Sequence, residues 1–142
     1  MTKTRREFLE LTAMCAAGCA AARLLGGCSD SGGAPLLAND VVLSLAAYPV
    51  LAANGGQVEI SSSISGYPFP IFVRNDGGVY TALGGFCDHE ACAVNAVGGG
   101  FRCPCHGATF SQGGQVTGGP ASQAMPAFTT QVAGDTLTIL KD

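Results

Sequence analysis

Both histidines and four of the seven cysteines of this 142-residue chain lie in one short stretch, residues 84–110. They fall into two groups of three, which are Cys87, His89 and Cys92, followed by Cys103, Cys105 and His106. Thiolates and imidazoles are side chains that bind zinc and iron readily. Thirteen residues, 90–102, separate His89 from Cys103, which is enough for a short hairpin that brings the two groups face to face. The stretch therefore predicts metal or sulfur chemistry.

A zinc site is the simplest use of two cysteines and two histidines, and its ligands would be Cys87, His89, Cys103 and His106. Zinc leaves Cys92 and Cys105 without a role, and spare cysteines in an oxidising compartment should pair as a disulfide. The spacing Cys-x-His also differs from the Cys-x2-Cys start that is common in structural zinc sites. A framework of disulfides alone gives no reason for a histidine in each group. Both alternatives leave part of the pattern unexplained.

The composition predicts a β-rich domain that does not bind nucleic acid. Only 12% of the residues are charged, and 21 are glycines, which disfavours long helices. From Cys28 onward there are three Lys/Arg and eight Asp/Glu, so this part carries a formal charge of −5. Nucleic-acid binding needs a basic surface, and this sequence offers none.

Short apolar runs separated by glycine and asparagine predict an all-β fold. We expect strands at residues 41–45, 57–60, 69–74, 79–83, 115–117, 128–133 and 136–140. Residues 75–78, Asn-Asp-Gly-Gly, predict a hairpin turn because these residue types tolerate positive φ. Strands at this spacing, without a helical period, indicate an antiparallel β sandwich or barrel.

Residues 1–27 predict an export signal. A pair of arginines, Arg5 and Arg6, precedes a charge-free apolar run at residues 11–22 that is too short to span a bilayer. The pair, followed by Phe-Leu, resembles the bacterial twin-arginine (Tat) signal, which exports folded proteins. We therefore expect the mature protein on the periplasmic side of a bacterial membrane.

Residues 25–28, Leu-Gly-Gly-Cys, resemble a lipoprotein box, which makes Cys28 the expected lipid anchor. The alternatives are an ordinary cleavage site or an uncleaved leader that serves as the anchor. Residues 28–40 have the composition of a flexible tether. The compact domain is expected at residues 41–142.

The two groups of cysteine and histidine together resemble the cluster-binding loops of Rieske 2Fe–2S proteins. Residues 87–92 match the family's C-x-H-x-x-C loop, and residues 103–107, Cys-Pro-Cys-His-Gly, match its second loop. The resemblance implies a Rieske-like antiparallel β sandwich or barrel that carries one 2Fe–2S cluster between two loops. It implies four ligands, Cys87 and Cys103 on one iron and His89 and His106 on the other. It also implies a disulfide between Cys92 and Cys105 that clamps the loops.

Mixed ligation makes a cluster easier to reduce, because neutral imidazoles replace two negative thiolates next to the irons. Such centres have midpoint potentials of about −150 to +300 mV. High-potential members of the family usually have serine and tyrosine hydroxyls shortly after the second histidine. This chain has Ala108 and Phe110 at those positions. We therefore expect a potential in the lower part of the range.

Residues 118–121, Gly-Gly-Pro-Ala, resemble the family's proline loop, which covers the far side of the cluster. Ser122 replaces the second proline that is often found there, so we expect a softer cover. Asp88 and Glu90, which flank the first histidine, are expected to be solvated loop residues.

The resemblance implies one-electron transfer in one of several settings. The first is the quinol-oxidising Rieske subunit of a cytochrome bc-type complex, with a cytochrome b or c as partner. The second is an electron-transfer subunit of a periplasmic oxidoreductase of the arsenite oxidase type, with a molybdenum subunit as partner. The third is a soluble ferredoxin for an aromatic-ring oxygenase, which normally lacks the disulfide pair. A sensor or structural module is a different class. No nucleophile–base pair is evident, so we expect no catalysis by this chain alone.

Overall fold

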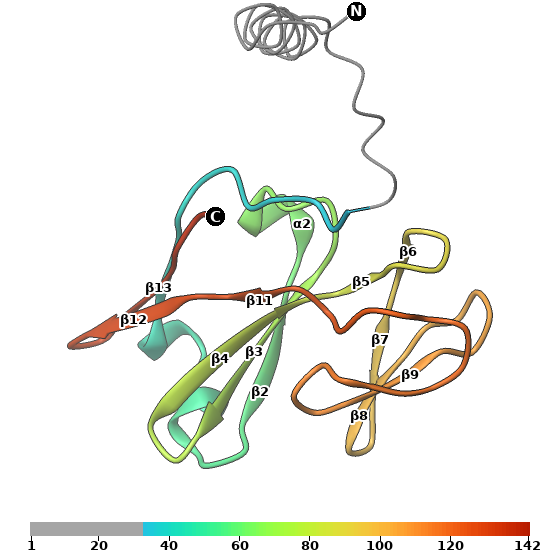
Figure 1. The fold of residues 1–142 in the computed structure, drawn as a ribbon. Helices are drawn as coiled ribbons and strands as arrows, with labels where there is room; N and C mark the ends of the chain where they lie inside the picture. Colours follow the sequence, from blue (N-terminus) through green and yellow to red (C-terminus); the bar gives the residue numbers. More distant parts are fainter. Residues whose placement is uncertain (1–32) are drawn as a thin grey trace, which may run out of the picture. The chain divides into compact units, whose positions relative to one another are not determined.

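The structure is a computed structural model that describes residues 33–142. The expected Tat signal and the expected lipid anchor at Cys28 lie outside the described residues. The described chain forms antiparallel sheets connected by short loops (Figure 1). This confirms the all-β antiparallel fold class, and none of the sheets in residues 33–142 closes into a barrel.

Two sheets form the first part of the domain. One has the strand order β1-β13-β12 and the other β11-β4-β3-β2. The bounds of the first sheet are β1 (Val41–Ser44), β13 (Thr136–Ile139) and β12 (Thr130–Ala133). Those of the second are β2 (Gln57–Ile60), β3 (Ile71–Asp76), β4 (Val79–Gly84) and β11 (Ala127–Phe128). Both sheets contribute to one apolar core, in which Leu51, Ile60, Ile71, Leu137 and Ile139 are fully buried.

The second part carries the cysteines and histidines. It contains the hairpin of β5 (Phe86–Cys87) and β6 (Cys92–Ala93), and a sheet of order β10-β9-β8-β7. The strands of that sheet are β7 (Asn95–Val97), β8 (Gly100–Arg102), β9 (Thr109–Ser111) and β10 (Val116–Gly118). The β7–β8 hairpin lies in the interval between the two groups, where a hairpin was expected.

The β3–β4 hairpin separates two hydrophobic cores. Successive side chains of a strand point to opposite faces, and Val73 with its partner Ala82 packs into the first core. Phe72 and its partner Leu83 pack into a second core, which contains Cys87 among its members. The expected turn joins these strands at Gly77 and Gly78, whose φ angles are +67° and +97°.

Three short helices were not expected from the sequence, namely η1 (Leu45–Ala47), η2 (Pro49–Ala52) and α2 (Ser62–Ser65). Each is a single turn or less, too short to show a hydrophobic period. Gly66, with φ of +70°, ends α2. Within residues 33–142, no helix has the length and apolar character to cross a membrane.

The end of the expected tether is part of the folded domain. Leu37 is only 1% exposed and belongs to the first core. Its N–H donates to the Asp142 carboxylate at 2.9 Å, and the Asp142 N–H donates to its carbonyl at 3.3 Å. The Lys141 N–H likewise donates to the Asp40 carboxylate at 2.9 Å. The composition of residues 28–40 does not show these contacts, because they depend on where the C-terminus lies.

The burial of Leu37 predicts that alanine substitutions at two neighbouring leucines differ strongly in their effect on stability. Leu37→Ala should destabilise the domain by about 2–5 kcal/mol, because it removes a buried side chain and leaves a cavity. Leu36 is 74% exposed, so Leu36→Ala should change stability by less than about 0.5 kcal/mol. Thermal unfolding followed by circular dichroism measures both. Equal effects of the two substitutions would show that residues 33–40 are a tether.

Candidate metal centre

The first loop is the turn of the β5–β6 hairpin. Cys87 and Cys92 are direct cross-strand partners, and residues 88–91 connect them. The hairpin is held to the rest of the domain by the Gly85 N–H, which donates to the Pro70 carbonyl at 2.7 Å. Cys87 is 1% exposed, whereas His89 at the tip is exposed. The hairpin therefore directs one thiol inward and leaves one imidazole at the surface.

The second loop connects β8 to β9 and has a similar construction. The Cys103 N–H donates to the Ala108 carbonyl at 2.8 Å, and the Gly107 N–H donates to the Cys103 carbonyl at 3.0 Å. Gly107 adopts φ of +78°, a conformation that favours glycine. Cys103 is 2% exposed, and His106 is exposed. This loop also presents one thiol inward and one imidazole outward.

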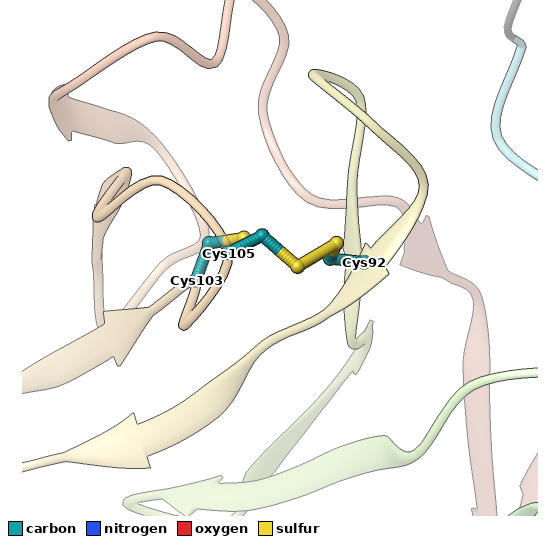
Figure 2. A group of neighbouring side chains, drawn as sticks. All are labelled: Cys92, Cys103 and Cys105. Atoms are coloured by element: carbon teal, nitrogen blue, oxygen red, sulfur yellow. A yellow bond between two sulfur atoms is a disulfide. The ribbon is translucent and has the colours of Figure 1, made fainter.

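A disulfide between Cys92 and Cys105 joins the two loops (Figure 2). This is the pair that the Rieske resemblance implied. Their Cα atoms are 6.5 Å apart, and the Cys103 sulfur lies within 4.8 Å of both disulfide sulfurs. Sulfurs in a disulfide are not thiolates, so Cys92 and Cys105 cannot serve as thiolate ligands.

The two free cysteines of the described chain are Cys87 and Cys103, and both are buried. Burial raises the pKa of the Cys87 thiol, an effect opposed by the backbone N–H of His89 and reinforced by a hydrogen bond with Cys103. Metal ligation requires the thiolate. Without a cation the Cys87 thiol therefore favours its protonated form, and a bound metal would replace that proton.

The two imidazoles lie side by side at the surface. The ring centroids of His89 and His106 are 4.9 Å apart, and the rings are perpendicular. The Glu90 carboxylate lies 3.6 Å from Nδ1 of His106, and the side chains of these two residues are 58% and 48% exposed. Ligand atoms of His89, Glu90 and His106 all lie within 4.8 Å of one another.

The grouping of these atoms fits two metal ions better than one. Within residues 33–142, the Cys103 sulfur groups with other sulfurs and the imidazoles group with Glu90, and no such group joins a thiol to an imidazole. A tetrahedral zinc ion, with bonds of about 2.0–2.3 Å, would draw two thiolates and two imidazoles into one tight group. Cys87 and Cys103, which share a hydrogen bond, instead form one pair and the two imidazoles another, an arrangement that suits a centre with two irons.

Asp88 is not the solvated loop residue that we expected. Its half-buried carboxylate accepts hydrogen bonds from the Ser122 N–H, the Ser122 hydroxyl and the Gln123 N–H. Partial burial raises the pKa of the Asp88 carboxyl, but these hydrogen bonds outweigh it and leave the pKa below the ordinary value. The sequence carries no signal for this contact, because Asp88 and Ser122 are 34 residues apart.

Apolar side chains surround the second loop. Ala108 is fully buried and Phe110 is 3% exposed. Neither side chain has a hydroxyl. The Thr109 hydroxyl, between them, donates to the Gly118 carbonyl at 3.4 Å. Gly119, with φ of +87°, lies directly against this loop, and a Cβ there would be 2.6 Å from the Cα of Ala108. The residues expected to form the proline loop therefore pack on the second loop.

Comparison with known proteins identifies one family whose match includes both loops. The Rieske [2Fe-2S] domain family matches residues 52–129. The cytochrome b6-f complex iron-sulfur subunit 1 of Nicotiana tabacum is 36% identical over 104 residues, which cover 68% of this chain and 43% of that protein. The corresponding subunit of Chlorobaculum thiosulfatiphilum is 34% identical over 73 residues, which cover 50% of this chain and 40% of that protein. The chain thus matches less than half the length of these two relatives.

Among solved structures, the plasma membrane Rieske protein PetC3 from Synechocystis PCC 6803 is 34% identical to this chain. The match covers 61% of this chain and 86% of that protein, with a TM-score of 0.48.

Proposed function

The chain belongs to the Rieske [2Fe-2S] domain family, and we propose that it is the quinol-oxidising subunit of a membrane-bound chain of the cytochrome bc type. It is an electron-transfer protein that binds one 2Fe–2S cluster. The observation that best supports the quinol role is the pair of exposed imidazoles, His89 and His106, at the tip of two loops. An imidazole at the surface accepts a hydrogen bond from a quinol hydroxyl and takes up its proton.

We propose that Cys87 and Cys103 hold the inner iron and that His89 and His106 hold the outer one. Two buried free thiols and two neighbouring exposed imidazoles supply this donor set. The bound cluster supplies one-electron chemistry. The surrounding residues keep water from Cys87 and Cys103 and leave His89 and His106 exposed. Electron transfer and proton transfer therefore both take place at the two histidines.

The ligand set predicts the metal content of single variants. The full chain should contain about two irons and two acid-labile sulfides per molecule. Cys87→Ser, Cys103→Ser, His89→Ala and His106→Ala should each lose most of this content. Glu90→Gln is the matched control, because Glu90 groups with the two histidines and would be a ligand of a single-metal site. One zinc and no sulfide, or metal loss in Glu90→Gln, would overturn the ligand set.

The surroundings of the second loop predict the potential. Hydrogen bonds to a cluster stabilise the reduced form, which carries more negative charge. Because Ala108 and Phe110 are buried and lack hydroxyls, we expect a midpoint potential in the lower part of the Rieske range.

A hydroxyl restored at the second loop should raise the midpoint potential. A hydrogen bond that is about 1–2 kcal/mol stronger to the reduced cluster corresponds to about 40–90 mV. We expect shifts of this order in Ala108→Ser and Phe110→Tyr, and none in Ala133→Ser, which is an exposed position in β12. A redox titration measures all three. A parent midpoint at the top of the range, equal to that of high-potential quinol-oxidising proteins, would refute the expectation.

Direct reduction by quinol tests the proposed role. A soluble naphthoquinol, which is a stronger reductant than the corresponding benzoquinol, suits a low-potential centre. We expect it to bleach the cluster much faster than an outer-sphere metal complex of equal potential, because only the quinol can hydrogen-bond to an exposed imidazole. Stopped-flow absorbance measures both rates on the full chain. Equal rates for the two reductants would argue against quinol oxidation.

The second candidate is an electron-transfer subunit of a periplasmic oxidoreductase of the arsenite oxidase type. The absence of hydroxyls at Ala108 and Phe110 favours it, since those hydroxyls are usual in high-potential respiratory proteins. A soluble ferredoxin for an oxygenase is disfavoured by the Cys92–Cys105 disulfide, which such ferredoxins normally lack.

We also infer that the protein works on the periplasmic side of the membrane. The Arg5-Arg6 motif supports Tat export, and the box that ends in Cys28 supports a lipid anchor. Disulfides persist in oxidising compartments such as the periplasm, so the Cys92–Cys105 bond agrees with this location.

A further inference from the structure

The segment from Gly119 to Met125, here called the cover segment, contacts both metal-binding loops. At its start, Gly119 packs against Ala108 of the second loop. At its end, the Met125 N–H donates to the Gly114 carbonyl at 2.8 Å, and the Met125 side chain is 3% exposed. Ala121 is 7% exposed and packs in the same core as Cys87 and Cys103. The cover segment therefore contributes to the core that contains the two free thiols.

The exposed middle of the cover segment is held by Asp88. Within the described residues, the hydrogen bonds of residues 119–124 all end on this carboxylate. The Ser122 N–H lies 3.1 Å from both carboxylate oxygens, and the Gln123 N–H lies 3.1 Å from one of them. The Ser122 hydroxyl donates to the same oxygen as Gln123. Hydrogen bonds to a charged acceptor are stronger than neutral ones.

The position of Asp88 in the sequence links the cover segment to the first loop. Asp88 stands between Cys87 and His89, one residue from each of the two proposed ligands of the first loop. The three hydrogen bonds to the Asp88 carboxylate therefore fix the cover segment. They also fix the part of the first loop that contains Cys87 and His89. The contact also depends on Ser122, because a proline at that position would have neither an N–H nor a hydroxyl.

We propose that Asp88 is a positioning residue that fastens the cover segment to the first loop and thereby shields the cluster from solvent. The proposal rests on the ligand set proposed above, because shielding has meaning only if the cluster lies under this segment.

The experiment follows loss of the cluster from the full chain in the presence of an iron chelator, by visible absorbance. We expect Asp88→Ala to lose its cluster at least about tenfold faster than the parent, since three hydrogen bonds to a carboxylate are removed. Asp88→Asn keeps a carbonyl acceptor without the charge and should restore most of the protection. Ser122→Ala should show a smaller acceleration, and Asp88→Ala/Ser122→Ala should be no faster than Asp88→Ala alone.

The matched control is Asp135→Ala. Asp135 also accepts from one serine hydroxyl and one backbone N–H, those of Ser44 and Ala46, but in the β1–β13 region. It should lower the unfolding temperature without changing the rate of cluster loss. Asp88→Ala should in addition shift the midpoint potential and the electron paramagnetic resonance spectrum, which a purely structural role would leave unchanged.

The outcomes separate the positioning role from the proposed function. Cluster loss from Asp88→Ala at the parent rate, equal acceleration in Asp135→Ala, or an unchanged spectrum and potential would each overturn the positioning role while leaving the ligand set standing. Full chain that is purified without iron and sulfide would instead overturn the ligand set itself.

Discussion

The disulfide between Cys92 and Cys105 is the covalent link on which the metal centre depends. The two loops belong to different sheets, and their strands do not pair with each other. Each loop by itself offers one buried thiol and one exposed imidazole, which is half of the donor set. The disulfide closes a short stretch of chain, with a sequence separation of 13, and holds the halves together. The two remaining thiols of the described residues, Cys87 and Cys103, are free and buried.

The β3–β4 hairpin connects this centre to the rest of the domain. One face of the hairpin belongs to the first core, and the other face presents Phe72 and Leu83 to the core that contains Cys87 and Cys103. The ring centroids of Phe72 and Phe101 are 4.7 Å apart. Phe101 immediately precedes Arg102 and Cys103 in the sequence. Because protein cores are densely packed, a change in the packing of one core alters the packing of the other through this hairpin. The metal-binding loops are short, and their positions depend on this shared sheet.

Burial and charge divide the centre into two unlike ends. The thiol end lies in an apolar core, where the Cys87 thiol has a raised pKa because of burial. The imidazole end faces solvent, where protons can exchange. Asp88, the acidic residue between Cys87 and His89, accepts hydrogen bonds from the cover segment that satisfy its charge.

The sequence by itself determined the chemistry of the site, because residue type and close spacing along the chain specify the donor set at residues 87–92 and 103–107. It also determined the all-β class and the turn at Gly77 and Gly78, since local patterns and positive φ depend on few neighbours. Only the tertiary structure decided that Leu37 belongs to the core, that Asp88 binds Ser122, and that β9 forms and pairs with β8. These contacts join residues that are far apart in the sequence or residues without a strong local preference. Their partners are set by how the sheets pack.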